Sequence, residues 1–230
     1  MLVFEYQCRI SFGKNILYES AAEKIAGFID SALALKPEYL EFHQSKEYKY
    51  YCFDLPYPFE KGKVYEEKKV YTVRIRTVKQ ELAEYFLMKL PYHSGSGVYG
   101  HGGELKIIPR KILETVYSLT PVVLKTEQGY WRNNMTMQEY ERRLKENLVK
   151  KYNQFTGNRL DEDFQLYELM EIRNQKPVKI YYKGITLLGE KLSFVTAKNA
   201  SAQEIWYFAL GTGIAENNSR GCGFLNYRYL

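Results

Sequence analysis

The chain contains 230 residues, of which 45% are hydrophobic and 16% aromatic, and it carries a formal net charge of +6 with a pI near 8.9. A chain of this length can bury a core as one large or two small domains, and its basic character favours an anionic partner such as nucleic acid. Its three cysteines lie far apart without Cys-x-x-Cys spacing, and no stretch of about 18 apolar residues occurs, so we expect no zinc site, no disulfide framework and no membrane partner. These features are typical of a cytoplasmic protein.

The first half of the sequence predicts the order strand, helix, strand, strand, helix, strand. Apolar and polar residues alternate over residues 4–12, which is typical of a strand with one buried face. Ser20 and Glu23 form a capping box, which predicts the start of the first helix. The remaining predicted elements of this half are strands over 48–53 and 69–77, a helix over 79–90 and a strand over 105–109. The glycine-rich residues 91–103 are expected to be mobile.

The second half repeats this order. Its predicted elements are a strand over 116–126, a helix over 136–152, strands over 178–182 and 188–196, a helix capped by Ser201 and Glu204 that ends near 210, and a strand over 224–229. An acidic insertion at 161–163, with a short helix, precedes the middle strands. The pattern predicts an α+β protein with two tandem ferredoxin-like (βαββαβ, RRM-like) domains, residues 1–110 and 111–230. Each sheet would bury one face against its helices, which leaves a central cleft between the free faces.

Basic residues follow two of the predicted strands. Arg74 and Arg76 lie opposite an apolar row and are expected to point into or beside the cleft. Lys179, Tyr181 and Lys183 place charge and an aromatic ring on one face of their strand, a pattern that suits contact with RNA. For Arg74 and Arg76 the alternative is a solvated strand face, because charged residues on exposed sheet faces are ordinary.

A glycine-rich segment, residues 211–223, follows the last predicted helix and leads into the last strand. Glycines with positive φ let backbone N–H groups converge on an anion, and Arg220 adds a charge beside them, so the segment is a candidate clamp for an RNA phosphate backbone. A P-loop is excluded, because it requires Lys-Ser/Thr after its last glycine and begins a helix. A dinucleotide fingerprint is excluded because Glu216 occupies the third glycine position. The alternative is a helix C-cap and turn.

The end of the chain resembles a known family signature. The residues that carry the resemblance are Gly211, Gly213, Glu216, Asn218, Ser219, Gly221, Gly223 and Phe224. They are similar to the terminal glycine-rich signature of the CRISPR-associated endoribonucleases that cut precursor CRISPR RNA within each repeat, the sixth Cas protein family of the RAMP superfamily. Cys222 stands where the family often has phenylalanine. The RNA-binding residues that this reading assigns to the segment are Gly211, Gly213, Asn218, Ser219, Arg220, Gly221 and Gly223.

The resemblance also implies where the catalytic residues lie. The family commonly has a catalytic histidine between the first helix and the next strand, with a lysine shortly after it. This makes His43 the acid/base and Lys46 or Lys49 the cation near the scissile phosphate. Some family members use a tyrosine of the first helix, which is absent here, so Tyr39 or Tyr18 would have to reach the site from the flanks of that helix.

The chain has three histidines, so each can be weighed. His93 and His101 lie in the glycine-rich segment that is expected to be mobile, and such a segment positions a proton-transfer group poorly. We therefore expect no catalytic role for these two. Without the resemblance, His43 would be interpreted as an ordinary surface histidine.

The reaction that the resemblance implies is metal-independent cleavage by attack of a ribose 2′-hydroxyl on the adjacent phosphorus. It leaves 2′,3′-cyclic phosphate and 5′-hydroxyl ends and generates mature guide RNAs, without a cofactor or a metal. The implied partner is CRISPR repeat RNA, and a CRISPR effector complex and a homodimer stay open as further partners. Two alternatives are a non-catalytic CRISPR RNA-binding subunit of the same superfamily and a tandem RNA-recognition module outside CRISPR systems, the latter weakened because neither half has that module's stacking motif.

Overall fold

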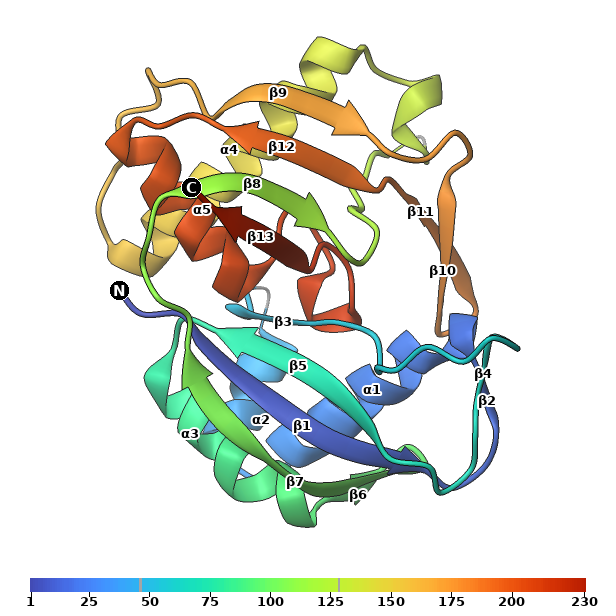
Figure 1. Ribbon diagram of the computed structural model, residues 1–230. Coiled ribbons are helices and arrows are strands. Elements are labelled where there is room, and N and C mark those ends of the chain that lie inside the picture. Colours follow the sequence, from blue (N-terminus) through green and yellow to red (C-terminus); the bar gives the residue numbers. More distant parts are fainter. Residues whose placement is uncertain (46, 128) are drawn as a thin grey trace.

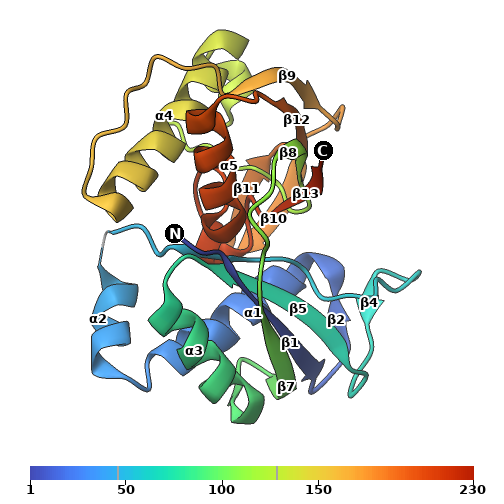
Figure 2. The same ribbon diagram turned by 60° about the vertical axis from the view of Figure 1, so that its left-hand side comes forward.

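The computed structural model describes residues 1–45, 47–127 and 129–230. It is an α+β fold with two antiparallel sheets, one above the other in Figure 1, and helices pack on one face of each sheet (Figure 2). Lys46, a predicted catalytic residue, lies outside the described residues. None of the helices in the described ranges has the length and hydropathy that a bilayer span requires.

The first sheet has the strand order β3-β5-β1-β7-β6, so that β1 lies between β5 and β7. A separate two-stranded ribbon pairs β2 with β4. The elements of this half are β1 (Phe4–Phe12), β2 (Ile16–Leu17), α1 (Tyr18–Leu33), α2 (Pro37–Gln44), β3 (Tyr51–Phe53), β4 (Val64–Tyr65), β5 (Tyr71–Thr77), α3 (Gln80–Lys89), η1 (Leu90–Tyr92), β6 (Ser94–Gly95) and β7 (Val98–Ile107).

The second sheet has the order β13-β8-β12-β9, so that β8 lies between β13 and β12. The hairpin β10–β11 is not part of this sheet, and it runs down beside α1 (Figure 1). The elements of this half are β8 (Leu113–Ser118), η2 (Trp131–Asn133), α4 (Met137–Thr156), β9 (Tyr167–Ile172), β10 (Val178–Tyr182), β11 (Ile185–Gly189), β12 (Leu192–Thr196), α5 (Ala200–Thr212), η3 (Asn218–Arg220) and β13 (Leu225–Tyr229).

Each sheet packs against its helices through its own apolar cluster. The alternation predicted for β1 is confirmed, because Tyr6, Cys8 and Ile10 are buried in the apolar cluster that also contains residues of α1. The second cluster contains most of α5, and Val3 and Val78 of the first half also belong to it. A Cβ on Gly211 in α5 would lie 2.8 Å from Val78, so glycine lets this helix approach the first half closely. The two sheets are thus joined by a buried contact along α5.

The segment expected to be mobile is ordered. Residues 98–103 extend β7 and pair with β1, while β6 pairs with the start of β7. Gly100 and Gly103 are required by close packing, since a Cβ on either would overlap the backbone carbonyl of Leu90 or Gln7. His93 and His101 are also held, by contacts of 2.8 and 2.7 Å between their Nε2 atoms and the hydroxyls of Ser31 and Ser11. The predicted mobility was wrong because strand pairing with β1 supplies order that the glycine-rich sequence does not indicate.

Both predicted helix caps were misplaced. Helix α1 begins at Tyr18, upstream of the Ser20 capping box, and its N-cap Leu17 forms no side-chain hydrogen bond. Helix α5 is capped by Asn199, whose side chain accepts from the Ala202 amide at 2.9 Å. The short helix predicted beside the acidic insertion is absent, because residues 161–163 form no helix. Residues 178–182 were predicted to be the second strand of the second sheet, but that place next to β12 is taken by β9.

Candidate active site and RNA-binding surface

His43 lies in the last turn of α2 beside an acidic residue of α1. Its Nδ1 atom is 3.3 Å from Oδ1 of Asp30, and its side chain is 33% exposed. Pro37 begins α2, where its fixed φ suits the first turn. The pKa of Asp30 is raised by burial, and its neighbours His43, Lys183 and Arg220 act against that rise. The imidazole of His43 is therefore partly open to solvent, and its Nδ1 side faces the carboxyl group of Asp30.

Cations reach Asp30 from distant parts of the chain. Lys183 stands at the turn of β10–β11, where it and Gly184 both adopt positive φ, as a tight hairpin turn requires. This turn places Lys183 and Tyr182 beside α1, where they share a cavity with Asp30. Arg220, at the end of η3, lies over the Tyr182 ring at 4.6 Å. The hairpin and the glycine-rich segment thus bring two predicted RNA-binding residues, Lys183 and Arg220, toward Asp30, the neighbour of His43. Lys179 lies exposed on β10.

Lys49 is engaged with α2 itself. Its Nζ atom donates to the carbonyl of Phe42 and, at 2.7 Å, to that of Ser45, the residues on either side of the helix end that carries His43. A lysine that binds the last carbonyls of a helix stabilises its C-terminus. Burial lowers the pKa of Lys49. In this arrangement Lys49 holds the end of α2 in place.

The two predicted tyrosine helpers point elsewhere. The Tyr39 hydroxyl donates to the Glu81 carbonyl of α3 at 3.2 Å, and its ring packs edge-on against Tyr85. Tyr18 packs against aromatic rings at the other end of α1. A tyrosine that the sequence did not single out, Tyr51 of β3, is buried next to Asp30 and Ser219. Only the tertiary structure shows that Tyr51 lies beside Asp30, because the sequence pattern predicts no more than a core residue of a strand.

Most backbone N–H groups of the glycine-rich segment already donate to carbonyl groups of the protein. The N–H groups of Gly213, Gly221 and Gly223 donate to the carbonyls of Ala209, Asn218 and Pro121. All three glycines have positive φ, so they form the turns of the segment. These amides are therefore not open to a phosphate, and Gly211 is a buried helix residue. The exposed cationic group of the segment is the side chain of Arg220.

Lys151 of α4 holds this segment from inside. Its side chain is buried, at 2% exposure, and its Nζ atom donates to the carbonyls of Gly213 and Ala215 at 3.0 and 3.2 Å and to Asn218 Oδ1 at 2.7 Å. Burial lowers the pKa of Lys151 to about 7. A cavity of about 460 Å³ opens between this segment and residues 45 and 47–51, with Lys49, Ser219 and Arg220 on its wall. The cavity connects the segment to the loop that follows His43.

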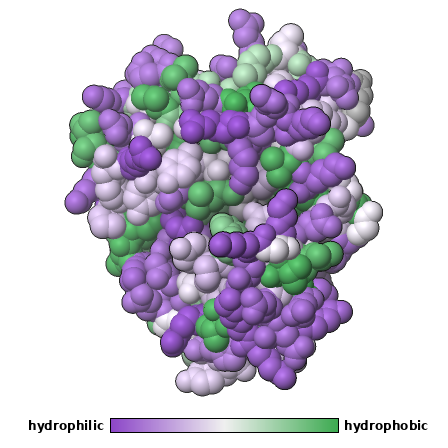
Figure 3. All heavy atoms as spheres, turned by 45° about the vertical axis from the view of Figure 1, so that its right-hand side comes forward, coloured by the Kyte–Doolittle hydropathy of each residue, from purple (hydrophilic) through white to green (hydrophobic). Residues whose placement is uncertain are grey.

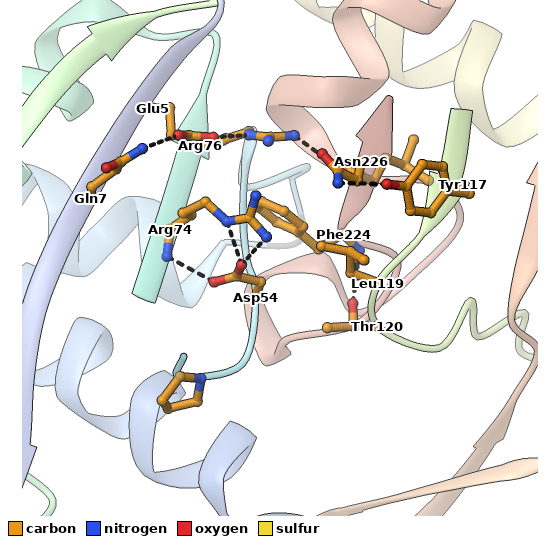
Figure 4. Close-up of polar contacts among 12 residues, drawn as sticks. Glu5, Gln7, Asp54, Arg74, Arg76, Tyr117, Leu119, Thr120, Phe224 and Asn226 are labelled. Atoms are coloured by element: carbon orange, nitrogen blue, oxygen red, sulfur yellow. Dashed lines mark hydrogen bonds and ion pairs between the residues drawn. The ribbon is translucent and has the colours of Figure 1, made fainter. Parts of the chain in front are cut away.

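The two arginines of β5 have different environments between the sheets. Arg76 is 1% exposed; its Nε lies 2.7 Å from Glu5 Oε2 and its Nη1 donates to the Leu225 carbonyl at 2.6 Å. Arg74 is paired with Asp54 but remains partly exposed. Figure 4 shows both guanidinium groups beside Phe224. Their central carbon atoms lie 4.4 Å from the ring centroid for Arg76 and 5.2 Å for Arg74. Arg76 therefore joins the two sheets and has no free guanidinium group. Arg74 instead lines a groove between the sheets.

That groove contains a cavity of about 600 Å³ between the sheets. Arg74 and Lys191 supply charge to its wall, and Tyr57 and Phe59 supply rings that are 65% and 56% exposed. Exposed aromatic rings next to cations can stack on unpaired bases. The molecular face in Figure 3 is mostly hydrophilic, with small separate hydrophobic patches, which suits a polar partner.

Comparison with known proteins identifies the family. Residues 106–227, more than half of the chain, match the family model described as CRISPR associated protein Cas6, C-terminal. The chain belongs to the Cas6 family. The match covers β8, β9, β12, the start of β13 and the whole glycine-rich segment, so the resemblance noted in the sequence is confirmed at the level of the family. No curated protein sequence matches the chain.

Solved Cas6 structures share the fold along the whole chain. One described as CRISPR associated protein Cas6 is 21% identical, with a TM-score of 0.72 and coverage of 98% of this chain and 99% of that one. A RAMP protein described as binding different RNA substrates is 15% identical, with a TM-score of 0.73 and coverage of 99% and 100%. A Cas6 solved as a product complex is 17% identical, with a TM-score of 0.65 and coverage of 99% of both chains. At these identities the likeness concerns the fold.

Proposed function

We propose that this Cas6-family chain is an endoribonuclease that cleaves precursor CRISPR RNA within its repeats and so generates mature guide RNAs. The observation that carries the proposal is the partly exposed imidazole of His43, which lies 3.3 Å from Asp30 with Lys183 and Arg220 nearby. A histidine suits proton transfer near neutral pH, and cations suit the charge that develops on phosphate oxygens.

The proposed reaction needs no group beyond the protein and the RNA. His43 takes the proton of the ribose 2′-hydroxyl, whose oxygen attacks the adjacent phosphorus while the bond to the 5′-oxygen breaks. Water protonates the departing 5′-oxygen, and the imidazolium later returns its proton to solvent. The products are a 2′,3′-cyclic phosphate and a 5′-hydroxyl end. Arg220 and Lys183 stabilise the pentacovalent oxygens, and Lys49 keeps the end of α2 in place.

We further propose that residues 1–110 and 111–230 form two ferredoxin-like domains and that the RNA enters the groove between their sheets. In each half, the first strand of the sheet lies between the third and fourth, counting β1, β3, β5 and β7 or β8, β9, β12 and β13, which supports this reading. Arg74, Tyr57 and Phe59 would contact unpaired nucleotides there. The relative solved as a product complex and the one described as binding RNA have the same fold.

The test is cleavage of the repeat RNA encoded beside this protein, in EDTA, under single-turnover conditions. We expect the wild type to cut at one position and His43→Ala to lose at least about 100-fold in rate with RNA affinity retained. His101→Ala is the matched control, because His101 contacts Ser11 away from α2. Equal rates for wild type and His43→Ala would remove His43 from the mechanism. A requirement for magnesium would overturn the mechanism, and tight binding without any cleavage would favour the non-catalytic RNA-binding subunit.

A further inference from the structure

We propose that Asp30 is a positioning residue for His43: it fixes the orientation of the imidazole so that Nε2 faces the substrate. The inference rests on the proposed function, because it assigns a partner to the proton-transfer group of that reaction. Asp30 lies in the last turns of α1 and His43 in the last turn of α2, so the packing of these two helices brings them together.

The first support is geometric. Asp30 Oδ1 and His43 Nδ1 are both shielded from solvent, and neither forms a hydrogen bond with any residue that the structure describes. The contact of 3.3 Å between them is the one polar contact that the structure gives to either atom. The contact has an ion-pair distance without hydrogen-bond geometry, and a small rotation of the ring within it would direct Nδ1–H at the carboxylate and leave the other nitrogen as the proton acceptor. The carboxylate also favours the imidazolium that forms when the proton moves.

The second support is the charge around the carboxyl group. Lys183 faces it from the β10–β11 turn, Arg220 from η3 and Lys49 from the segment after α2, and the Tyr51 hydroxyl adjoins it from β3. Burial alone would favour the neutral acid, and these cations favour the carboxylate. The competing role for Asp30 is that of a counter-ion that holds Lys183 and Arg220 in place without acting on His43.

Asp30→Asn tests both roles, because it keeps the shape of the side chain and removes its charge, and the RNA affinity and the pH–rate profile then separate them. We expect the single-turnover rate to fall at least about 10-fold, up to the roughly 10⁴-fold that the equivalent change costs in a Ser-His-Asp triad, with RNA affinity within about threefold of wild type. The acid limb of the pH–rate profile should move to lower pH, since the imidazolium loses its neighbouring carboxylate. The double variant Asp30→Asn/His43→Ala should be no slower than His43→Ala alone.

The matched control is Glu23→Gln on the same helix. Glu23 lines the same cavity as Asp30, two turns earlier in α1, and should leave the rate and pH profile unchanged. Thermal melting of each variant identifies any loss of folding. An Asp30→Asn protein with wild-type rate, in a series where His43→Ala is inactive, would overturn the proposal but leave the function intact. A parallel loss of RNA affinity and rate with an unchanged pH profile would assign Asp30 to the counter-ion role. A cleavage rate unchanged by His43→Ala would instead overturn the proposed function.

Discussion

Lys151 Nζ donates to Asn218 Oδ1 at 2.7 Å, which links the middle of α4 to the turn that carries Ser219 and Arg220. Asn218 in turn donates through its side-chain amide to the carbonyls of Ile214 and Cys222, at 2.9 and 3.1 Å. The glycine-rich segment is thus organised by a buried lysine and an asparagine, while its glycines supply the required backbone angles. The turn that carries Arg220 is thus held from below by the buried amino group of Lys151.

Replacing Lys151 should loosen this turn. Lys151→Met leaves the Gly213 and Ala215 carbonyls and the Asn218 side chain without their donor, and one unsatisfied buried polar group costs about 1–3 kcal/mol. We expect a loss of about 2 kcal/mol in the free energy of unfolding at pH 9, measured by urea denaturation. Lys150→Met, the exposed neighbour on α4, is the control and should change stability little. Equal stability of the two variants would contradict the structural role of Lys151.

The same residue makes stability depend on pH. Burial lowers the pKa of Lys151 to about 7 in the folded protein, below its ordinary value of 10.5. Between these values the unfolded chain binds more protons than the folded one, so the stability that depends on Lys151 rises with pH across this window. The stability difference between wild type and Lys151→Met should therefore grow from pH 7 to pH 9.5, by at most about 1.4 kcal/mol per pH unit. A difference that stays constant would show that Lys151 does not titrate there.

Arg76 should matter for folding and not for RNA binding. Arg76→Met leaves the Glu5 carboxylate without its partner in a buried position, where breaking a pair costs about 3–5 kcal/mol. We expect a loss of this order in urea denaturation. The double variant Glu5→Leu/Arg76→Met removes both charges and should recover much of the stability. A stable Arg76→Met protein with weakened RNA binding would return Arg76 to the RNA-contacting surface.

Arg220→Ala should weaken RNA affinity and reduce its dependence on salt. Arg220 is exposed, and a lost phosphate contact lowers the slope of log K against log salt by about 0.7 to 0.9. Arg142→Ala is the control, because Arg142 is an exposed arginine of α4 that pairs with Glu146. The measurement is filter binding of uncleaved RNA to the His43→Ala background at several salt concentrations. The same slope for Arg220→Ala and Arg142→Ala would reduce the segment around Arg220 to a structural turn.

The glycines of the segment should respond to substitution according to their backbone angles. Gly223 has a φ of 66°, and a Cβ there would overlap the Ile214 carbonyl. Gly223→Ala should therefore destabilise the fold by about 1–3 kcal/mol or more, as measured by thermal melting. At Gly62 a Cβ meets nothing within 4 Å, so Gly62→Ala should be close to neutral. Similar melting temperatures for the two variants would mean that the segment can relax around a side chain.

Local sequence patterns were sufficient to predict most elements and the family. The alternation in β1 and in β5 indicates strands whichever partner they find, because the pleat alone puts alternate side chains on opposite faces. The terminal glycines indicated the Cas6 family, which the family match confirms. The same reasoning failed at residues 98–103, where no alternation exists and β1 provides the hydrogen bonds.

The sequence by itself determined the α+β elements, the basic charge and the family, since these follow from periodicity, composition and a short local signature. Tertiary structure decided which charges can reach a ligand. Arg76 and Lys151 look like surface cations in the sequence, yet both are buried. Arg76 lies between the two sheets, and Lys151 is enclosed between α4 and the glycine-rich segment. No local sequence pattern marks Asp30 as a site residue. It becomes the neighbour of His43 because α1 and α2 pack against each other. Cations from the β10–β11 turn and from η3 then lie near its carboxyl group. Electrostatic roles depend on distance and burial, which the order of residues along a chain does not specify.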